Sequence, residues 1–352
     1  MPLISGWLRS RSFRGLCGLF LGAIAFTLLL RLGLSFLPVK STPATSLVTL
    51  EQIPPTAQPV RVGFYGLNIY NLDIASNSYF LDAYIWFRWK GKIDPIADLE
   101  FANAVDDWGM TQKPGYEKPQ LQPDGSFYQI LRVEGRFIQP FNLARYPLDQ
   151  QQISIMLENS IYTAKDLVYL ADTQDSGYAD TLAIHGWSIT DWSSQNLLRT
   201  YSSNFGLAIP DTSPYSVVRF AILIERPVSY FIWKLLFPLM IVLMSGCGAL
   251  LLHPSYADSR VVLPVTALLT VVFLQQSYSN DIPEVGYLVL LDKIYALAYF
   301  LIITAVMAAI FTAGRVKDKG GDSYVSIVQI DRCFLALQVI ALVTGVWGLI
   351  QL

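Results

Sequence analysis

Cysteine is scarce in this sequence: Cys17, Cys247 and Cys333 are the only three among 352 residues. All three lie in apolar stretches, so no disulfide bond is available to hold the polar middle part of the chain together. The only histidines are His185 and His253, and with so few of them we do not expect a zinc site built from cysteine and histidine. No nucleophile–base motif or phosphate-binding loop occurs, and we therefore expect neither an enzyme nor a bound metal or cofactor.

Charged residues are also few, at 15% of the chain, whereas 53% is hydrophobic and the mean hydropathy is +0.41. This composition excludes a wholly soluble protein of this length and predicts a membrane protein with a sizeable soluble part. The apolar excess lies at residues 16–37 and again from residue 230 onward, whereas residues 41–226 carry a net charge of −7. Such a charge raises the local concentration of cations, or serves only to keep the domain soluble.

The start of the chain indicates an export signal. Arg9, Arg11 and Arg14 precede the apolar run 16–30, which is long for the core of a signal peptide and short for a membrane span. We predict a signal peptide or N-terminal hydrophobic segment over residues 1–40, cleaved shortly afterwards; an uncleaved anchor is the alternative. Either outcome exports the domain that follows.

Residues 41–226 favour β-strands with one buried face. In residues 79–89, 153–157 and 218–224, apolar side chains recur at a period of two, the pattern of a strand with one side in a core. Turn clusters such as residues 122–125 separate the runs, and no long amphipathic helix is evident. We predict an exported antiparallel β-sandwich.

Residues 227–352 contain four apolar segments, which predict a transmembrane domain. The predicted fold class is therefore a β-sandwich followed by a four-helix transmembrane bundle. Each of its apolar segments is long enough to cross a bilayer. The helices are expected at about residues 230–252, 258–280, 287–313 and 327–352.

The second of these helices differs from the others because polar residues recur along one stripe. Steps of three and four residues place the stripe on one helix face, and the helix spans about 33 Å. Copies around an axis would form an acidic ring, a hydroxyl ring, a hydrophobic constriction and an amide ring, which suit a cation pore. The alternative is that Thr266 bonds its own backbone and Gln276 packs against another helix. The predicted pore-lining residues are Asp258, Val262, Thr266, Leu269, Phe273, Gln276 and Asn280.

The orientation of the helices follows from basic residues after the third one. Arg315, Lys317 and Lys319 place that loop in the cytoplasm by the positive-inside rule. Asp258 is then cytoplasmic, and Glu284 lies outside with the exported β domain.

Several motifs occur in the order and spacing of a known family. Residues 146–151 read Tyr-Pro-Leu-Asp-Gln-Gln, Arg226 and Pro227 precede the first membrane helix, and residues 255–283 end in Asn-Asp-Ile-Pro. Over roughly residues 60–352 the chain resembles the pentameric ligand-gated ion channels, or Cys-loop receptor superfamily. The resemblance is to the bacterial type that lacks the loop disulfide.

In this family the sandwich transmits ligand binding to the pore at the membrane interface. The resemblance implies that an ion pair between Asp149 and Arg226 takes part. Such a pair can bias a two-state element by roughly a few kcal/mol, the scale that gating requires; a purely structural role is the alternative. The implied coupling residues are Tyr146, Pro147, Asp149, Arg226, Asp281, Pro283 and Glu284.

Agonists of this family bind between neighbouring sandwiches, in a box of aromatic side chains that suits cationic amines. Ser160 stands where amine receptors have their key tryptophan, so both a small-molecule agonist and protons remain candidate stimuli. Sheet packing is the alternative role for each aromatic. The implied ligand-binding residues are Phe101, Tyr162, Tyr201 and Tyr215 on the principal face and Tyr84 and Trp86 on the complementary face.

The resemblance also implies roles along the pore helix. Asp258 selects cations at the cytoplasmic mouth, Leu269 is the hydrophobic gate, and Phe273 adds a second constriction. Arg260 is expected to face away from the lumen and pair with a neighbouring acid, a pore-facing charge being the alternative. Pro264 removes one backbone hydrogen bond from the helix, as a hinge or as a static bend.

We therefore expect one subunit of a homopentamer in a bacterial inner membrane, with the β-sandwich on the extracellular side. Its expected partners are membrane lipid, permeating monovalent cations and a small-molecule agonist or protons, and no nucleic acid. The alternative from another class is a membrane-anchored β-sandwich sensor that does not conduct ions.

Overall fold

The computed structural model describes residues 46–105, 109–203, 205–206, 213–280, 282–319 and 324–351. The expected signal segment and Asp281 lie outside these residues. Within them, the chain divides into two compact units. The strand-forming unit contains Asp149–Pro227 and the described residues before Leu143, and the helical unit contains Leu143–Leu148 and the described residues from Val228 onward.

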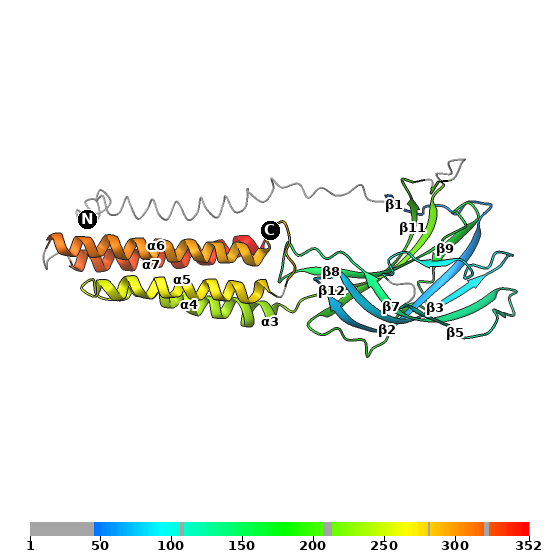
Figure 1. Ribbon diagram of the computed structural model, residues 1–352, viewed down its shortest axis with the longest axis horizontal. Helices are drawn as coiled ribbons and strands as arrows, with labels where there is room; N and C mark the ends of the chain where they lie inside the picture. The colour runs from blue at the N-terminus through cyan, green and yellow to red at the C-terminus, as the bar shows by residue number, and fades with distance from the viewer. Residues whose placement is uncertain are drawn as a thin grey trace. The chain divides into compact units, whose positions relative to one another are not determined.

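The strand-forming unit consists of long and short strands joined by turns (Figure 1). The residues that alternate at a period of two in the sequence lie in its longest strands. The strands are β1 (Ser46–Thr49), β2 (Gln58–Asp73), β3 (Ser78–Trp89), β4 (Leu99–Phe101), β5 (Thr111–Pro114), β6 (Gln120–Leu121), β7 (Phe127–Ile138), β8 (Gln150–Asn159), β9 (Leu167–Ala171), β10 (Gly177–Tyr178), β11 (Ser188–Thr200) and β12 (Tyr215–Glu225).

These strands form two sheets that pack face to face. One is five-stranded, with the order β1-β11-β12-β8-β4, and the other is seven-stranded, with the path β10-β2-β3-β7-β5 and with β6 and β9 paired to β7 and β2. Neighbouring strands are antiparallel, except that β9 and β10 both pair with β2 in parallel. The predicted β-sandwich is confirmed, with these two parallel pairs as its departure from an antiparallel fold.

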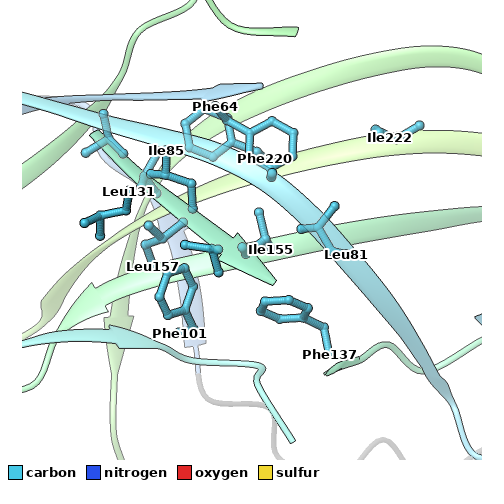
Figure 2. Close-up of a cluster of buried hydrophobic side chains, with 14 of the residues drawn as sticks. Phe64, Leu81, Ile85, Phe101, Leu131, Phe137, Ile155, Leu157, Phe220 and Ile222 are labelled. Atoms are coloured by element: carbon cyan, nitrogen blue, oxygen red, sulfur yellow. The ribbon is translucent and has the colours of Figure 1, made fainter. Parts of the chain in front are cut away.

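The core lies between the sheets and is filled by the alternating apolar residues (Figure 2). Leu81 and Ile85 of β3 are 2% and 0% exposed, and Leu157 of β8 is 0% exposed on the facing sheet. The rings of Phe64 and Phe220 stack across the core with centroids 5.3 Å apart. Each buried side chain of this size stabilises the fold by about 2 kcal/mol, so burial of one face fixes which residues of each strand point outward.

The helical unit contains four helical stretches that are long and apolar enough to cross a membrane. The first is continuous but irregular, because a turn of π-helix and a final 3-10 turn flank its α-helical part. The elements are α3 (Val228–Tyr230), η2 (Phe231–Leu236), α4 (Phe237–Gly248), η3 (Ala249–Leu251), α5 (Ala257–Ser279), α6 (Leu290–Lys319) and α7 (Tyr324–Ile350).

Close packing joins these helices into one bundle. Helix α5 packs against α4 and α6, and α7 packs against α6 and η3. Gly246 of α4 faces Pro264 and Ala267 of α5, and a Cβ added at Gly246 would lie 2.7 Å from the Cβ of Ala267. The glycine thus lets the two helices approach closely. The predicted fold class, a β-sandwich followed by four membrane helices, is confirmed.

Candidate functional site

Helix α5 has one face that packs inside its own chain. Its buried residues are Arg260, Pro264, Ala267, Val271 and Tyr278. At about 100° per residue these five side chains lie within roughly 60° of arc. The helix is continuous through Pro264, whose buried position against α4 explains why a proline is tolerated there.

The predicted pore-lining stripe lies on the opposite face of α5. All of its residues are exposed in the single chain, and Leu269 and Phe273 are 56% and 65% exposed. Their mean direction is roughly half a turn away from the buried face. Only 22% of the α5 span is buried, against 56% of the α6 span, so α5 presents the surface that further subunits or lipid must cover.

Hydrogen bonds along the stripe stay within α5. The hydroxyl of Thr266 donates to the carbonyl of Val262 at 2.9 Å, the backbone bond that we weighed as the alternative role of Thr266. The amide of Gln276 donates to Oδ1 of Asn280 at 3.3 Å and is exposed rather than packed against another helix. These polar groups remain on the outer face of the helix.

Arg260 points away from the stripe and is buried in the bundle. Its side chain is 0% exposed, and Nη2 lies 2.5 Å from Oδ2 of Asp331 in α7. This is the neighbouring acid that the sequence predicted without identifying it. Asp331 carried a signal of its own, since an acid inside an apolar span is costly unless it has a partner or a function.

The loop Leu143–Leu148 is inserted in the sandwich sequence but belongs to the helical unit. Tyr146 is 2% exposed, and its ring stacks on Tyr278 of α5 with centroids 6.5 Å apart. The carbonyls of Ala144 and Tyr146 accept hydrogen bonds from the backbone N–H groups of Leu290 and Leu291.

These contacts attach the loop to the end of α5 and the start of α6. Pro147 is also buried in this loop, whereas Pro283 is half-buried and Glu284 exposed in the α5–α6 connector. Tyr278 was not singled out from the sequence, because it lies on the buried face of α5 and not on the exposed stripe. It also donates a short hydrogen bond to the carboxylate of Asp292 in α6.

Asp149 and Arg226 form an ion pair within the strand-forming unit. Nε of Arg226 lies 2.9 Å from Oδ1 of Asp149, and their side chains are 13% and 1% exposed. Gln151 donates a second hydrogen bond to Asp149, at 2.6 Å, and the guanidinium lies 4.2 Å from the ring centre of Trp187. The pair is therefore buried and well satisfied; its role in gating stays a prediction.

Two of the tyrosines predicted for the principal face lie together, Tyr201 directly after β11 and Tyr215 at the start of β12. The rings of Tyr201 and Tyr215 meet edge to face with centroids 5.7 Å apart. Beside them Glu158 is 2% exposed, and its Oε1 accepts hydrogen bonds from the hydroxyl of Tyr201 and from Arg199. Its Oε2 has no hydrogen-bond partner among the described residues.

Burial dominates the electrostatics of this cluster. Desolvation raises the pKa of the Glu158 carboxyl despite the hydrogen bond from Tyr201 and the charge of Arg199. Desolvation and the same hydrogen bond raise the pKa of Tyr201 to about 12. Glu158 was not among the predicted ligand-binding residues, because the alternation of β8 placed it on the face opposite the apolar residues Ile155 and Leu157.

The residues predicted for the complementary face line a hollow on the seven-stranded sheet. The hollow has a volume of about 550 Å³, and its lining includes Tyr84, Trp86 and Arg88. Trp86 donates from Nε1 to Oδ2 of Asp172 at 3.3 Å. Its indole lies over Gly63, where an added Cβ would come within 1.9 Å of the ring, so a glycine is required there. Further residues of the lining are Tyr65, Tyr116, Gln122, Tyr128, Ile130 and Asp175.

Two of the predicted ligand residues do not join these clusters. Phe101 is 4% exposed and meets Phe137 edge to face in the sandwich core. It therefore packs the sheets together, which was the alternative role that we considered for it. Tyr162 is half-buried against the same core, and its backbone N–H donates to Oδ1 of Asn159.

Known proteins with similar sequences are ion channels and receptors. A proton-gated ion channel of Gloeobacter violaceus is 21% identical over 276 residues, which cover 72% of this chain and 73% of that protein. A gamma-aminobutyric acid receptor subunit beta of Caenorhabditis elegans is 21% identical over 72% of this chain, and subunit beta-4 of Gallus gallus is 23% identical over 70%. No protein-family model matches the chain.

The resemblance to the pentameric ligand-gated ion channels is confirmed, since the chain is similar over 70–72% of its length to a proton-gated ion channel and to two receptor subunits. The matches cover 47% and 53% of the two receptor subunits, so this chain spans about half the length of those relatives. The relatives are channels and receptors and not enzymes. This chain has no disulfide at residues 146–151, because its sequence has no cysteine near them.

Proposed function

We propose that this chain is a subunit of a homopentameric, cation-selective channel whose pore is lined by α5. The observation that carries the proposal is the exposed stripe from Asp258 to Asn280, opposite the face with which α5 packs inside its own chain. A ring of such helices places carboxylates at one end and the Leu269 and Phe273 side chains in the middle. An acidic ring favours cations, and a hydrophobic ring blocks ions by excluding water.

We propose a bacterial inner membrane as the location of this channel. The β-sandwich, residues 41–226, lies on the extracellular side, residues 227–352 form the membrane domain, and residues 1–40 supply the export signal or an anchor. Arg315, Lys317 and Lys319, which the structure places in the last turns of α6 rather than in the loop after it, support the cytoplasmic position of the Asp258 end. A non-conducting sensor would have no need of the graded stripe.

Recordings from purified protein in planar bilayers test this proposal. In a potassium chloride gradient, the reversal potential of the wild-type current should lie near the equilibrium potential of potassium. Asp258→Ala should move this reversal potential toward zero. Asp258→Glu, which keeps the charge, should behave as wild type. A protein that assembles but carries no current under any stimulus, or a selectivity indifferent to Asp258→Ala, would count against the proposal.

We further propose that the agonist binds between two neighbouring subunits. Tyr215 lies on the five-stranded sheet and Tyr201 directly follows its strand β11, whereas Tyr84 and Trp86 line the hollow on the seven-stranded sheet. Because these groups lie on different sheets, a ring of subunits can bring the first group of one subunit to the second group of the next. The aromatic faces and the buried Glu158 suit a cationic amine.

Mixed rings distinguish a site between subunits from a site within one. Tyr201→Ala and Trp86→Ala should each weaken the response to whichever stimulus opens the wild type in a screen of pH and small amines. Co-assembly of the two variants restores some interfaces with both intact faces, so part of the sensitivity should return. No recovery in mixed rings of confirmed composition would refute the shared site.

Protons are the second candidate stimulus. One relative is a proton-gated ion channel, and Glu158 is a buried carboxyl whose pKa is raised. Protonation of Glu158 would break its charge-assisted contact with Arg199. If protons act here, acid should open wild-type channels without any amine, and Glu158→Gln should change the pH of half-activation.

A further inference from the structure

The buried pair between Arg260 and Asp331 joins the proposed pore helix to α7. The Arg260 and Asp331 side chains are 0% and 2% exposed, with Nη2 and Oδ2 2.5 Å apart. Nε and Nη1 of Arg260 have no hydrogen-bond partner among the described residues. Asp331 is therefore the group that balances the charge of this guanidinium.

Arg260 lies close to Asp258, the proposed selectivity residue. The two residues are two positions apart, so they are separated by about 3 Å along the helix axis and by about 200° around it. Asp258 is exposed on the stripe, whereas Arg260 is buried on the opposite face. An ion at the inner mouth of the pore would experience both charges, because a charge in a low-dielectric interior is poorly screened.

The charge that each subunit contributes to the mouth depends on Asp331. Asp258 and Arg260 alone would cancel, and a ring of such subunits would have no preference for cations. With Asp331 paired to Arg260, the two buried charges balance each other, and among these three residues the negative charge of Asp258 is left unpaired. The favourable acidic ring thus depends on a residue outside the pore helix.

We propose that Asp331 is a positioning residue for ion selectivity: it neutralises Arg260, so that the carboxylate of Asp258 alone sets the potential at the inner mouth. This inference rests on the proposed cation-selective function. It assigns a role in selectivity to α7, which contributes no residue to the proposed pore lining.

Permeability ratios measured from reversal potentials in a potassium chloride gradient test this role. Asp331→Asn should lower the potassium-to-chloride permeability ratio by about tenfold or more, since one unbalanced positive charge per subunit opposes cations over roughly 10 Å. Arg260→Gln/Asp331→Asn should return the ratio to the wild-type value, because it removes both buried charges together. Asp331→Glu should keep a cation preference.

A purely structural role gives a different result. It would reduce the number of assembled channels in Asp331→Asn without changing the permeability ratio of those that conduct. A wild-type ratio in conducting Asp331→Asn channels, or a ratio equally low in the double variant, overturns the inference. If Asp331→Asn does not assemble alone, tagged Asp331→Asn subunits diluted into wild-type rings should lower the ratio stepwise with their number, and the absence of steps overturns it as well.

The proposed function and this inference fail in distinguishable ways. If wild-type channels do not prefer cations, the proposed function is wrong. If wild-type channels prefer cations and Asp331→Asn channels prefer them equally, only the role of Asp331 is wrong.

Discussion

Arg226 and Asp149 form a buried ion pair, with Nε and Oδ1 2.9 Å apart, at the point where the strand-forming unit ends and the first membrane helix begins. The pair connects Asp149, within the signature motif at residues 146–151, to Arg226, which directly follows β12. Removing one partner would leave the other charge buried and unpaired, which costs far more than the pair itself contributes.

We therefore expect Asp149→Asn to destabilise the protein by about 3–5 kcal/mol. Denaturant unfolding followed by tryptophan fluorescence measures this, since Trp187 lies against the Arg226 guanidinium. Glu225→Gln is the matched control: its carboxylate accepts an exposed hydrogen bond from Gln150, and its loss should cost less than about 0.5 kcal/mol.

The role of this pair in gating is tested by exchanging its charges. In channels that assemble, Asp149→Arg/Arg226→Asp should restore gating that either single change abolishes. Normal assembly of the exchanged variant without recovery of gating would leave the pair with a structural role only.

Glu158 should make sandwich stability depend on pH. Because folding raises its pKa above the ordinary value of 4.5, the folded protein holds this proton more tightly than the unfolded chain. Its contribution to stability is complete below that ordinary value and is lost as the pH rises through the folded pKa. The melting temperature of Glu158→Gln, relative to wild type, should therefore rise from about pH 4 to about pH 7.

The control for this measurement is Glu134→Gln, which alters a carboxylate of β7 whose Oε1 accepts a hydrogen bond from Tyr70 in an exposed position. Its difference from wild type should follow another pH course. An identical pH course for the two variants would contradict the assignment to Glu158.

The stripe of α5 should be accessible to water in assembled channels. In a background without Cys17, Cys247 and Cys333, cysteines at Leu269 and Gln276 should react with a charged methanethiosulfonate reagent on the order of tenfold faster than one at Val271. Val271 is 0% exposed and lies on the packed face. Block of current at the reactive positions is the readout, and equal rates on the two faces would argue against a water-filled lumen there.

Close packing at Gly246 should limit substitution. Gly246→Ala places a Cβ 2.7 Å from that of Ala267, so we expect a loss of about 1–3 kcal/mol from overpacking. Thermal unfolding should show part of this loss recovered in Gly246→Ala/Ala267→Gly. Gly248→Ala is the control, because an added Cβ there meets nothing within 4 Å.

Local periodicity predicted much of the fold from the sequence. Alternation in β3 identified the residues that face the core, and steps of three and four residues identified the α5 stripe, because side-chain direction repeats every two residues in a strand and every 3.6 in a helix. The fold class and the exposed face of α5 needed no information from distant parts of the chain.

Pairing between distant residues could not be read in this way. The sequence indicated that Arg260 needs an acid but did not identify Asp331, which is 71 positions away. Likewise, Phe101 and Tyr201 are both aromatic, yet one packs the core and the other joins Glu158.

The sequence by itself determined the order of the segments, the direction of each side chain within its own strand or helix, and the motifs that the family shares. Only the tertiary structure decided which faces meet: that Tyr146 stacks on Tyr278, that Trp86 lies over Gly63, and that α7 supplies the counter-charge for α5. The physical reason is that periodicity arises from the local geometry of the backbone, whereas contacts between elements depend on how the whole chain packs its apolar faces and satisfies its buried charges.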